Sequence, residues 1–309
     1  MAINWKHYDE EEIKKKAPMV KISAHTNITD PILSGYPVLE SLRSFANLCD
    51  EVIVVDGGST DGSLEKIAKI DKVKIIQGEK WERDFDWRVM GKNLQIGYEA
   101  CQYDWVFHFD VDYIFHEDNV MKLKEIIARS HLPAIELRKV NFVLVNENYF
   151  KDHYPLLLFK KQYPVLCYGI GKDEKDHTSA TFLRPTIRSS NQKEKDGLYH
   201  GEVLMRSTVR THIEDIDVFT YDFTFMNKEQ VIEQRNRFDN SLRKFCRQGP
   251  ISKETSFKIF VDMMRYRHFL CKRNRGIKLE QHSKFIREKV AGIKPEMFGY
   301  SFWGLYLED

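Results

Sequence analysis

Two aspartates lie one residue apart directly after an apolar stretch of the sequence. Residues 105–109 are predicted to form a buried strand, and Asp110 and Asp112 follow it. Side chains at alternate positions of extended backbone point the same way, so both carboxylates are expected to face one cleft at the strand's carboxyl end. Carboxylate oxygens suit Mg²⁺ or Mn²⁺, which keep positions open for diphosphate oxygens. A solvated, Asp-rich turn is the alternative interpretation.

A second acid ends another predicted strand. Asp56 closes the β-branched run of residues 51–56, and the glycine-rich segment 57–62 follows it. Glycine lets the backbone approach a ligand closely, so Asp56 could accept hydrogen bonds from a nucleobase or ribose. Asp61 precedes a predicted short helix and is interpreted as its N-cap.

Alternating strands and helices must position these acids. Strands are predicted at 20–24, 51–56, 73–76 and 105–109, and helices at 36–48, 63–70 and 91–101, with the polar residues 25–27 forming a loop after the first strand. This alternation favours a three-layer α/β domain with a mostly parallel central sheet. The catalytic domain is expected to span 1–226, and a helical C-terminal extension 227–309.

The segment 20–118 resembles family 2 glycosyltransferases of the GT-A fold. It carries, in the family's order, a polar end to the first strand at 23–27, an acidic glycine-rich turn at 56–62 and a D-x-D motif at 110–112. A basic residue before Asn, at 91–93, stands where the family has one before D-x-D. The resemblance implies a GT-A-type domain that binds a nucleotide-sugar.

The resemblance also implies roles for single residues. Thr26 and Asp56 would line the nucleoside site, and Lys92 would lie near the diphosphate. Asp110 would lean toward the ribose or the metal, and Asp112 would bind the metal directly. The metal would be Mn²⁺ or Mg²⁺.

An inverting transfer needs a general base for the acceptor hydroxyl. The resemblance places this carboxylate well beyond the D-x-D motif, where Glu202 is the first candidate, Asp215 the second and Asp222 the third. Thr220 stands where related bacterial enzymes tend to carry a histidine ligand, so that ligand would be missing or replaced by Asp222. Gly57 stands where many members carry a second Asp, which leaves the nucleobase open.

Composition narrows the class of protein. The chain has 309 residues, a formal net charge of +2 and five cysteines. The widely spaced cysteines include no C-x-x-C pair, which argues against a disulfide framework or a zinc knuckle. The charged first 16 residues are unlike a signal peptide, and no apolar run reaches the length of a membrane span. A cytoplasmic protein is expected, with a location peripheral to a membrane as the alternative.

These features and the resemblance together predict transfer of a sugar from a nucleotide-sugar, a UDP-sugar first, to an acceptor hydroxyl. Inversion is implied by the resemblance alone. The resemblance implies a bacterial surface glycan or its lipid-linked precursor as the acceptor, and the basic residues between 235 and 287 would then suit a membrane surface. The same residues, with aromatics among them, would also suit DNA carrying a hydroxymethylated base, and a virus-type DNA glycosyltransferase is the main alternative. A metal-dependent hydrolase would leave Asp56 unexplained. The aromatic C-terminus, 298–306, could form a homodimer contact.

Overall fold

The computed structural model describes most of the chain. The described residues are 10–81, 87–131, 134–144, 148–151, 156–161, 165–168, 184–187, 211–245, 248–271 and 277–293. Within these ranges, no helix has the length and apolar character needed to cross a membrane.

A nine-stranded sheet forms the centre of the molecule, in the order β3-β2-β1-β4-β8-β6-β11-β5, with β7 paired to β6. Strands β3, β2, β1 and β4 run parallel, whereas β8, β5 and β7 pair antiparallel to their neighbours. The predicted α/β class with parallel central strands is therefore confirmed. The strands are β1 Ile22–Ile28, β2 Glu51–Asp56, β3 Val73–Gln77, β4 Trp105–His108, β5 Tyr113–Phe115, β6 Ala134–Leu144, β7 Asn148–Lys151, β8 Leu156–Lys160 and β11 Thr211–Thr220, while β9 Val165–Tyr168 and β10 Arg184–Ile187 form a separate pair.

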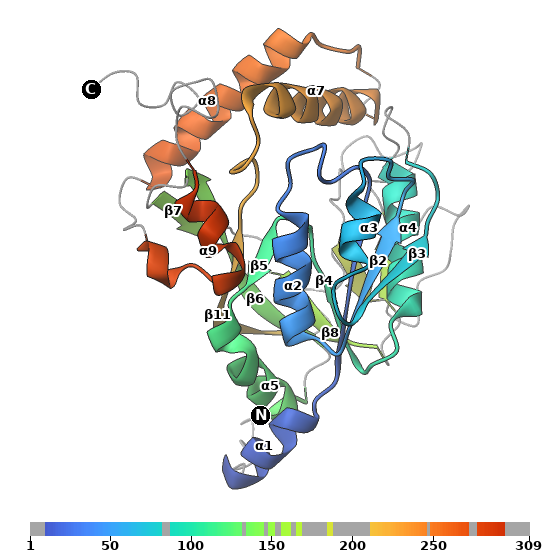
Figure 1. Ribbon diagram of the computed structural model, residues 1–309, viewed down its shortest axis with the longest axis vertical. Coiled ribbons are helices and arrows are strands. Elements are labelled where there is room, and N and C mark those ends of the chain that lie inside the picture. The colour runs from blue at the N-terminus through green and yellow to red at the C-terminus, as the bar shows by residue number, and fades with distance from the viewer. Residues whose placement is uncertain are drawn as a thin grey trace, which may run out of the picture.

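Helices surround the sheet, and α7 lies across the end of the molecule opposite α1 (Figure 1). Helix α2 packs its apolar side on the sheet, where the ring of Phe45 stacks on that of Phe109 at 3.8 Å between centroids. The helices are α1 Glu10–Lys16, α2 Val38–Leu48, α3 Ser63–Ile67, α4 Trp87–Ala100, α5 Val120–Arg129, α7 Lys228–Phe245, α8 Lys253–Cys271 and α9 Lys284–Ala291, with short 3₁₀ turns η1 Ala17–Met19, η2 Glu117–Asn119 and η3 Leu279–Gln281.

The first strand is longer than predicted. The polar residues 25–27 belong to β1, which continues to Ile28 and is buried at every position. The prediction of a loop there is wrong because the parallel pairing of β1 with β2 continues to Ile28, while β4 pairs with the other side of β1 as far as His25. The polar side chains are accommodated by α4: the Asn27 amide donates to the Met90 carbonyl at 3.4 Å, and a Cβ at Gly97 would lie 3.0 Å from His25 Nδ1.

The C-terminal segment returns to the sheet. In α9, Ile286 and Val290 pack with Ile114 of β5 and with Tyr221, directly after β11. The apolar contacts of α9 are thus made with the sheet. The division of the chain at residue 226 stays a prediction.

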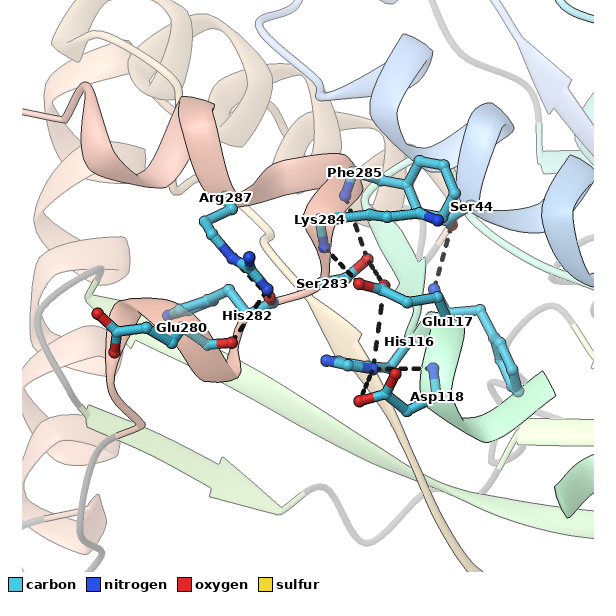
Figure 2. Close-up of polar contacts among 11 residues, drawn as sticks. Ser44, His116, Glu117, Asp118, Glu280, His282, Ser283, Lys284, Phe285 and Arg287 are labelled. Carbon is cyan, nitrogen blue, oxygen red and sulfur yellow. Dashed lines mark hydrogen bonds and ion pairs between the residues drawn. The ribbon is translucent and has the colours of Figure 1, made fainter. Parts of the chain in front are cut away.

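A polar network joins this segment to the residues that follow β5 (Figure 2). Glu117 accepts a hydrogen bond from Ser283 Oγ at 2.6 Å and one from the Lys284 backbone N–H at 2.9 Å. An acidic side chain at the N-terminus of α9 also interacts favourably with the helix dipole. Burial opposes ionisation of Glu117, but these hydrogen bonds outweigh it and lower its pKa.

Two buried histidines are held in their neutral form. Burial lowers the pKa of His25 well below 6.5, and the neighbouring His108 lowers it further. Burial also lowers the pKa of His282 to about 4, with smaller contributions from Arg287 and His116. The unfolded chain would therefore bind more protons than the native protein at mildly acidic pH.

We predict that the melting temperature is highest above about pH 6.5 and falls as the pH decreases toward 4. The raised pKa of Asp112 acts in the opposite direction, so the contribution of His282 must be isolated with a variant. His282→Gln, which carries no titrating group there, should lose less stability than the wild type between pH 7 and pH 5. Circular dichroism melts at several pH values measure both slopes. Equal slopes would contradict the assignment of a buried neutral His282.

Candidate functional site

The two aspartates after β4 lie in a tight turn. The Tyr113 backbone N–H donates to the Asp110 carbonyl at 3.0 Å, which closes the turn. The prediction of extended backbone here is therefore wrong, and alternation along a strand does not place the two side chains. Asp112 is buried, with 7% of its surface exposed, whereas the Asp110 side chain is 50% exposed.

The buried aspartate has other carboxylates around it. Burial raises the pKa of Asp112 well above its usual value, and the nearby charges of Asp222 and Asp110 raise it further. Lys139 of β6 acts in the opposite sense. Acids that repel one another in a poorly hydrated place favour either a proton or a bound cation.

Strand β11 brings the third acid to this turn. β11 pairs antiparallel with β5, and the Tyr221 backbone N–H donates to the Asp112 carbonyl at 3.0 Å. Asp222, third-ranked as a base in the sequence, thus lies next to the D-x-D motif. Glu202 lies outside the described residues, and Asp215 belongs to β11 with its side chain outside them.

Thr220, the last residue of β11, takes part in packing. Thr220, where a histidine ligand would stand in related enzymes, is fully buried and donates a hydrogen bond from Oγ1 to Asn141 of β6. Asp222, and not residue 220, is therefore the candidate for the further metal ligand.

The donor set fits a hard divalent cation that brings further ligands with it. Within the described ranges, no three or more His, Cys, Asp or Glu side chains are grouped so that they could hold a metal ion alone. Asp112 and Asp110 would supply two oxygen ligands, and phosphate oxygens would complete the set. His108 Nε2 lies 3.9 Å from Asp110 Oδ1, beyond hydrogen-bonding distance.

Asp56 shapes the turn that follows β2. Its carboxylate accepts hydrogen bonds from the backbone N–H groups of Gly58, at 3.1 Å, and of Ser59, at 2.9 Å. Asp56 is 2% exposed and lies at the carboxyl end of β2, where ligands of open α/β sheets bind. Gly58 has a φ of 98°, in the left-handed region that favours glycine.

Gly57 has no room for a side chain. A Cβ there would lie 2.5 Å from Thr29 Oγ1 and 2.9 Å from Trp81 Cβ. The Trp81 backbone N–H also donates to the Gly57 carbonyl at 2.8 Å. Many family members carry an aspartate at this position. Here the residue is glycine, and Trp81 and Thr29 occupy the space that a side chain would need.

Asp61 connects this turn to the loop between β1 and α2. Its carboxylate accepts from the backbone N–H groups of Ile32, Leu33 and Ser63, at 2.7 to 3.0 Å. The interpretation of Asp61 as the N-cap is off by one position, since Gly62, with a φ of 76°, directly precedes α3.

Two predicted donor-site residues lie near this edge of the sheet. Lys92 forms an ion pair with Glu79 at 2.9 Å, and its side chain is 62% exposed. Asn93 is fully buried and holds the loop after β3 through hydrogen bonds with both backbone groups of Glu79. Thr26 is 1% exposed, and its Oγ1 has no hydrogen-bond partner among the described residues.

Sequence reasoning missed two side chains near the acids. Burial raises the pKa of Tyr36 well above 10, with further contributions from Asp222, Asp112 and Asp110, while Arg237 lowers it. The guanidinium of Arg237, in α7, lies 5.9 Å from the centroid of the Trp81 ring. No local pattern marks Tyr36 or Arg237, because their proximity depends on how α7 packs.

Several solved structures are similar to this chain, whereas among curated proteins none matches it. The similar structures include a mycobacterial protein (16% identity, 54% of this chain and 63% of that chain covered, TM-score 0.37) and TarS 1–349 of S. aureus (14%, 85% and 77%, 0.39). Glucosyl-3-phosphoglycerate synthase of Mycobacterium tuberculosis, in complex with Mn²⁺, UDP and glucosyl-3-phosphoglycerate, is also similar (16%, 54% and 67%, 0.37).

The chain thus spans less than two thirds of the mycobacterial protein's length. Residues 36–184 match the family model described as glycosyl transferase family 2, and this range contains the Asp56 turn, Lys92 and the D-x-D motif. Residues 36–184 of this chain are thus similar to the glycosyl transferase family 2, and within this range β2, β3 and β4 belong to the parallel part of the sheet.

Proposed function

We propose that the protein transfers a sugar from a nucleotide-sugar to an acceptor hydroxyl with the help of Mn²⁺ or Mg²⁺, and with inversion at the anomeric carbon. The observation that carries this proposal is the buried Asp112 beside Asp110 and Asp222, at the carboxyl end of the parallel strands of a family 2 domain. A positive charge stabilises acids that repel one another, and the metal–diphosphate unit of a nucleotide-sugar supplies one together with oxygen ligands.

The metal would neutralise the charge that develops on the departing nucleoside diphosphate. Asp112 would bind it through its buried carboxylate, and the more exposed Asp110 would reach the metal or the ribose. Asp222 would be a further acid at the same centre. Asp56 would offer the nucleoside the lone pairs that its own turn leaves unused, and Thr26 would lie behind it.

The general base is proposed from the family resemblance. Glu202 remains the first candidate and Asp215 the second. Asp222 lies beside Asp112, whose charge raises the free energy of any neighbouring carboxylate. With a metal bound there, Asp222 is better suited to bind the cation than to accept a proton, since a cation lowers the basicity of a neighbouring carboxylate.

Arg237 is a candidate for the diphosphate site. It is placed by α7, whose first turn is fixed on the loop between β1 and α2: Gln230 Nε2 donates to the Leu33 carbonyl at 2.9 Å. Arg237 follows Gln230 by seven residues and therefore lies on the same side of the helix. Its guanidinium contacts Trp81, next to the Asp56 turn. A guanidinium can bind a phosphate with two parallel hydrogen bonds.

Three other basic residues of α7 and α8 have partners within the protein. Arg235 pairs with Asp239 at 2.7 Å, and Arg243 donates to the Gly249 carbonyl at 2.6 Å. Lys253 pairs with Glu233. These contacts do not favour a nucleic-acid interface over a glycan acceptor, so a hydroxyl of a surface glycan or of its lipid-linked precursor remains the proposed acceptor.

A donor screen tests the proposed function directly. The wild-type protein is incubated with UDP-, GDP-, CDP- and dTDP-sugars, each with and without Mn²⁺. We expect one base to raise the melting temperature, and its sugar to be hydrolysed slowly without acceptor, only when Mn²⁺ is present. A protein that neither binds nor hydrolyses any of these donors would contradict the proposal.

Asp112→Asn tests the metal site. The substitution keeps the shape of the side chain but removes the charge that would bind the metal, so Mn²⁺-dependent turnover should fall by about 100-fold or more. Removing a buried charge next to two other acids should leave the melting temperature without metal unchanged or higher. Asp71→Asn, at an exposed turn before β3, is the control and should behave as the wild type. Wild-type turnover in the Asp112→Asn variant would exclude the assigned metal role.

Arg237→Gln tests the proposed diphosphate contact. Losing a charged hydrogen-bond donor should weaken binding of the nucleoside diphosphate product by about 10-fold or more. Isothermal titration with Mn²⁺ present measures this affinity. Arg243→Gln removes the same charge from the same helix at a position whose side chain donates to the Gly249 carbonyl, in the α7–α8 connection. Equal affinities for both variants would assign Arg237 to packing against Trp81 alone.

A further inference from the structure

The hydroxyl of Tyr221 makes a short contact with an imidazole from the end of the chain. Tyr221 Oη lies 2.6 Å from Nδ1 of His282, and both side chains are buried. Burial raises the pKa of Tyr221 and lowers that of His282, so the phenol keeps its proton and the imidazole is neutral. In the tautomer of His282 that carries its proton on Nε2, Tyr221 Oη donates and Nδ1 of His282 accepts.

The same tyrosine is bonded to the metal turn through its backbone. The Tyr221 N–H donates to the Asp112 carbonyl at 3.0 Å, and Asp222 follows it in the chain. The position of Tyr221 thus affects both the buried aspartate of D-x-D and the acid beside it. Along the chain the two acids are 110 positions apart, so the hydrogen bond from Tyr221 links them far more directly than the covalent backbone does.

The ring and the backbone of His282 are each held by further contacts. The ring of Phe142, in β6, lies 5.0 Å from that of Tyr221 and 5.0 Å from that of His282. Arg287 donates to the His282 carbonyl at 2.9 Å, and Figure 2 shows this contact beside the Ser283–Glu117 contact. A buried hydrogen-bonded pair in such packing is held in one arrangement. The position of the Tyr221 side chain then fixes the position of its backbone N–H.

A purely structural role is the competing interpretation. A satisfied Tyr–His hydrogen bond in a core would stabilise the fold without any effect on the reaction. The two roles differ in their consequences, because a positioning role must change how the site binds its metal, whereas a packing role changes only the free energy of unfolding.

We infer that His282 is a positioning residue for the metal site, acting through Tyr221 to fix the relative placement of Asp112 and Asp222. This inference rests on the proposed function, in which these acids face a divalent cation. It assigns a part of the site to the segment 277–293, which lies outside the residues 36–184 that match the family model. Residues that orient metal ligands commonly change metal affinity by about 10- to 100-fold when they are replaced.

The test compares variants that keep the rings and lose the hydrogen bond. Tyr221→Phe removes only the hydroxyl, and His282→Phe removes the acceptor. His282→Asn restores an acceptor, because its Oδ1 can take the place of Nδ1. Ser283→Ala is the control: it removes the hydrogen bond to Glu117 from the next residue without touching Tyr221. Mn²⁺ affinity is measured by titration at a saturating concentration of the nucleoside diphosphate that binds the wild type, and melting temperatures are recorded without metal.

We expect both Phe variants to bind Mn²⁺ about 10-fold more weakly, and the double variant to bind no more weakly than either single one. His282→Asn should recover most of the affinity. Ser283→Ala should lower the melting temperature but keep the wild-type affinity. Unchanged Mn²⁺ affinity in folded Tyr221→Phe and His282→Phe would overturn the inference and leave a structural role. A wild-type protein without metal-dependent nucleotide binding would instead refute the proposed function, and the positioning role with it.

Discussion

The repulsion among three carboxylates is the constraint on which the arrangement of the site depends. Asp112 is buried with Asp222 and Asp110 near it, a combination that the chain would avoid without strong backbone support. That support comes from the pairing of β11 with β5 and from the hydrogen bond between Tyr221 and the Asp112 carbonyl. The sheet thus holds in place an unfavourable set of charges that a cation can relieve.

Close backbone contacts form the other side of the site. The turn after β2 is held by its own acid, Asp56, and packs so tightly on Trp81 that residue 57 must be glycine. Asp61 in turn holds the loop that α7 contacts through Gln230. A change in the β2 turn would therefore be felt at α7, although the two are far apart in sequence.

Much of the first half of the chain could be predicted from local patterns. The β-branched run of β2 and the apolar run of β4 each predict a strand that ends at an acid, because burial on both faces leaves a continuous apolar run in the sequence. The polar residues 25–27 of β1 misled the prediction, since pairing with β2 continues to Ile28 and keeps them in a strand. The D-x-D turn differs from the predicted extended segment because its closing hydrogen bond, Tyr113 to Asp110, leaves no mark in the residue types.

The parts of the site that could not be predicted depend on long-range pairing. Tyr36 and Arg237 come close to the acids, and His282 to Tyr221, only through the packing of α2, α7 and the residues before α9. Neither periodicity nor motif spacing contains that information for a single chain. The sequence leaves Asp222 open as a general base or a metal ligand. Only the register of β11 against β5 places it at the D-x-D turn.

The placement of β11 beside β5 also fixes when the site can exist during synthesis. Residues 112 and 222 are 110 positions apart, so the ribosome needs roughly 5 to 20 seconds to add the chain between them at common elongation rates. During that time β5 lacks its neighbour, and Asp112 lacks the backbone N–H that holds its carbonyl. The nascent chain is therefore expected to complete its acidic centre only after β11 has emerged, and to stabilise it once His282 arrives. Exposure of an unpaired strand edge over this interval would make the half-made chain the state most in need of a chaperone.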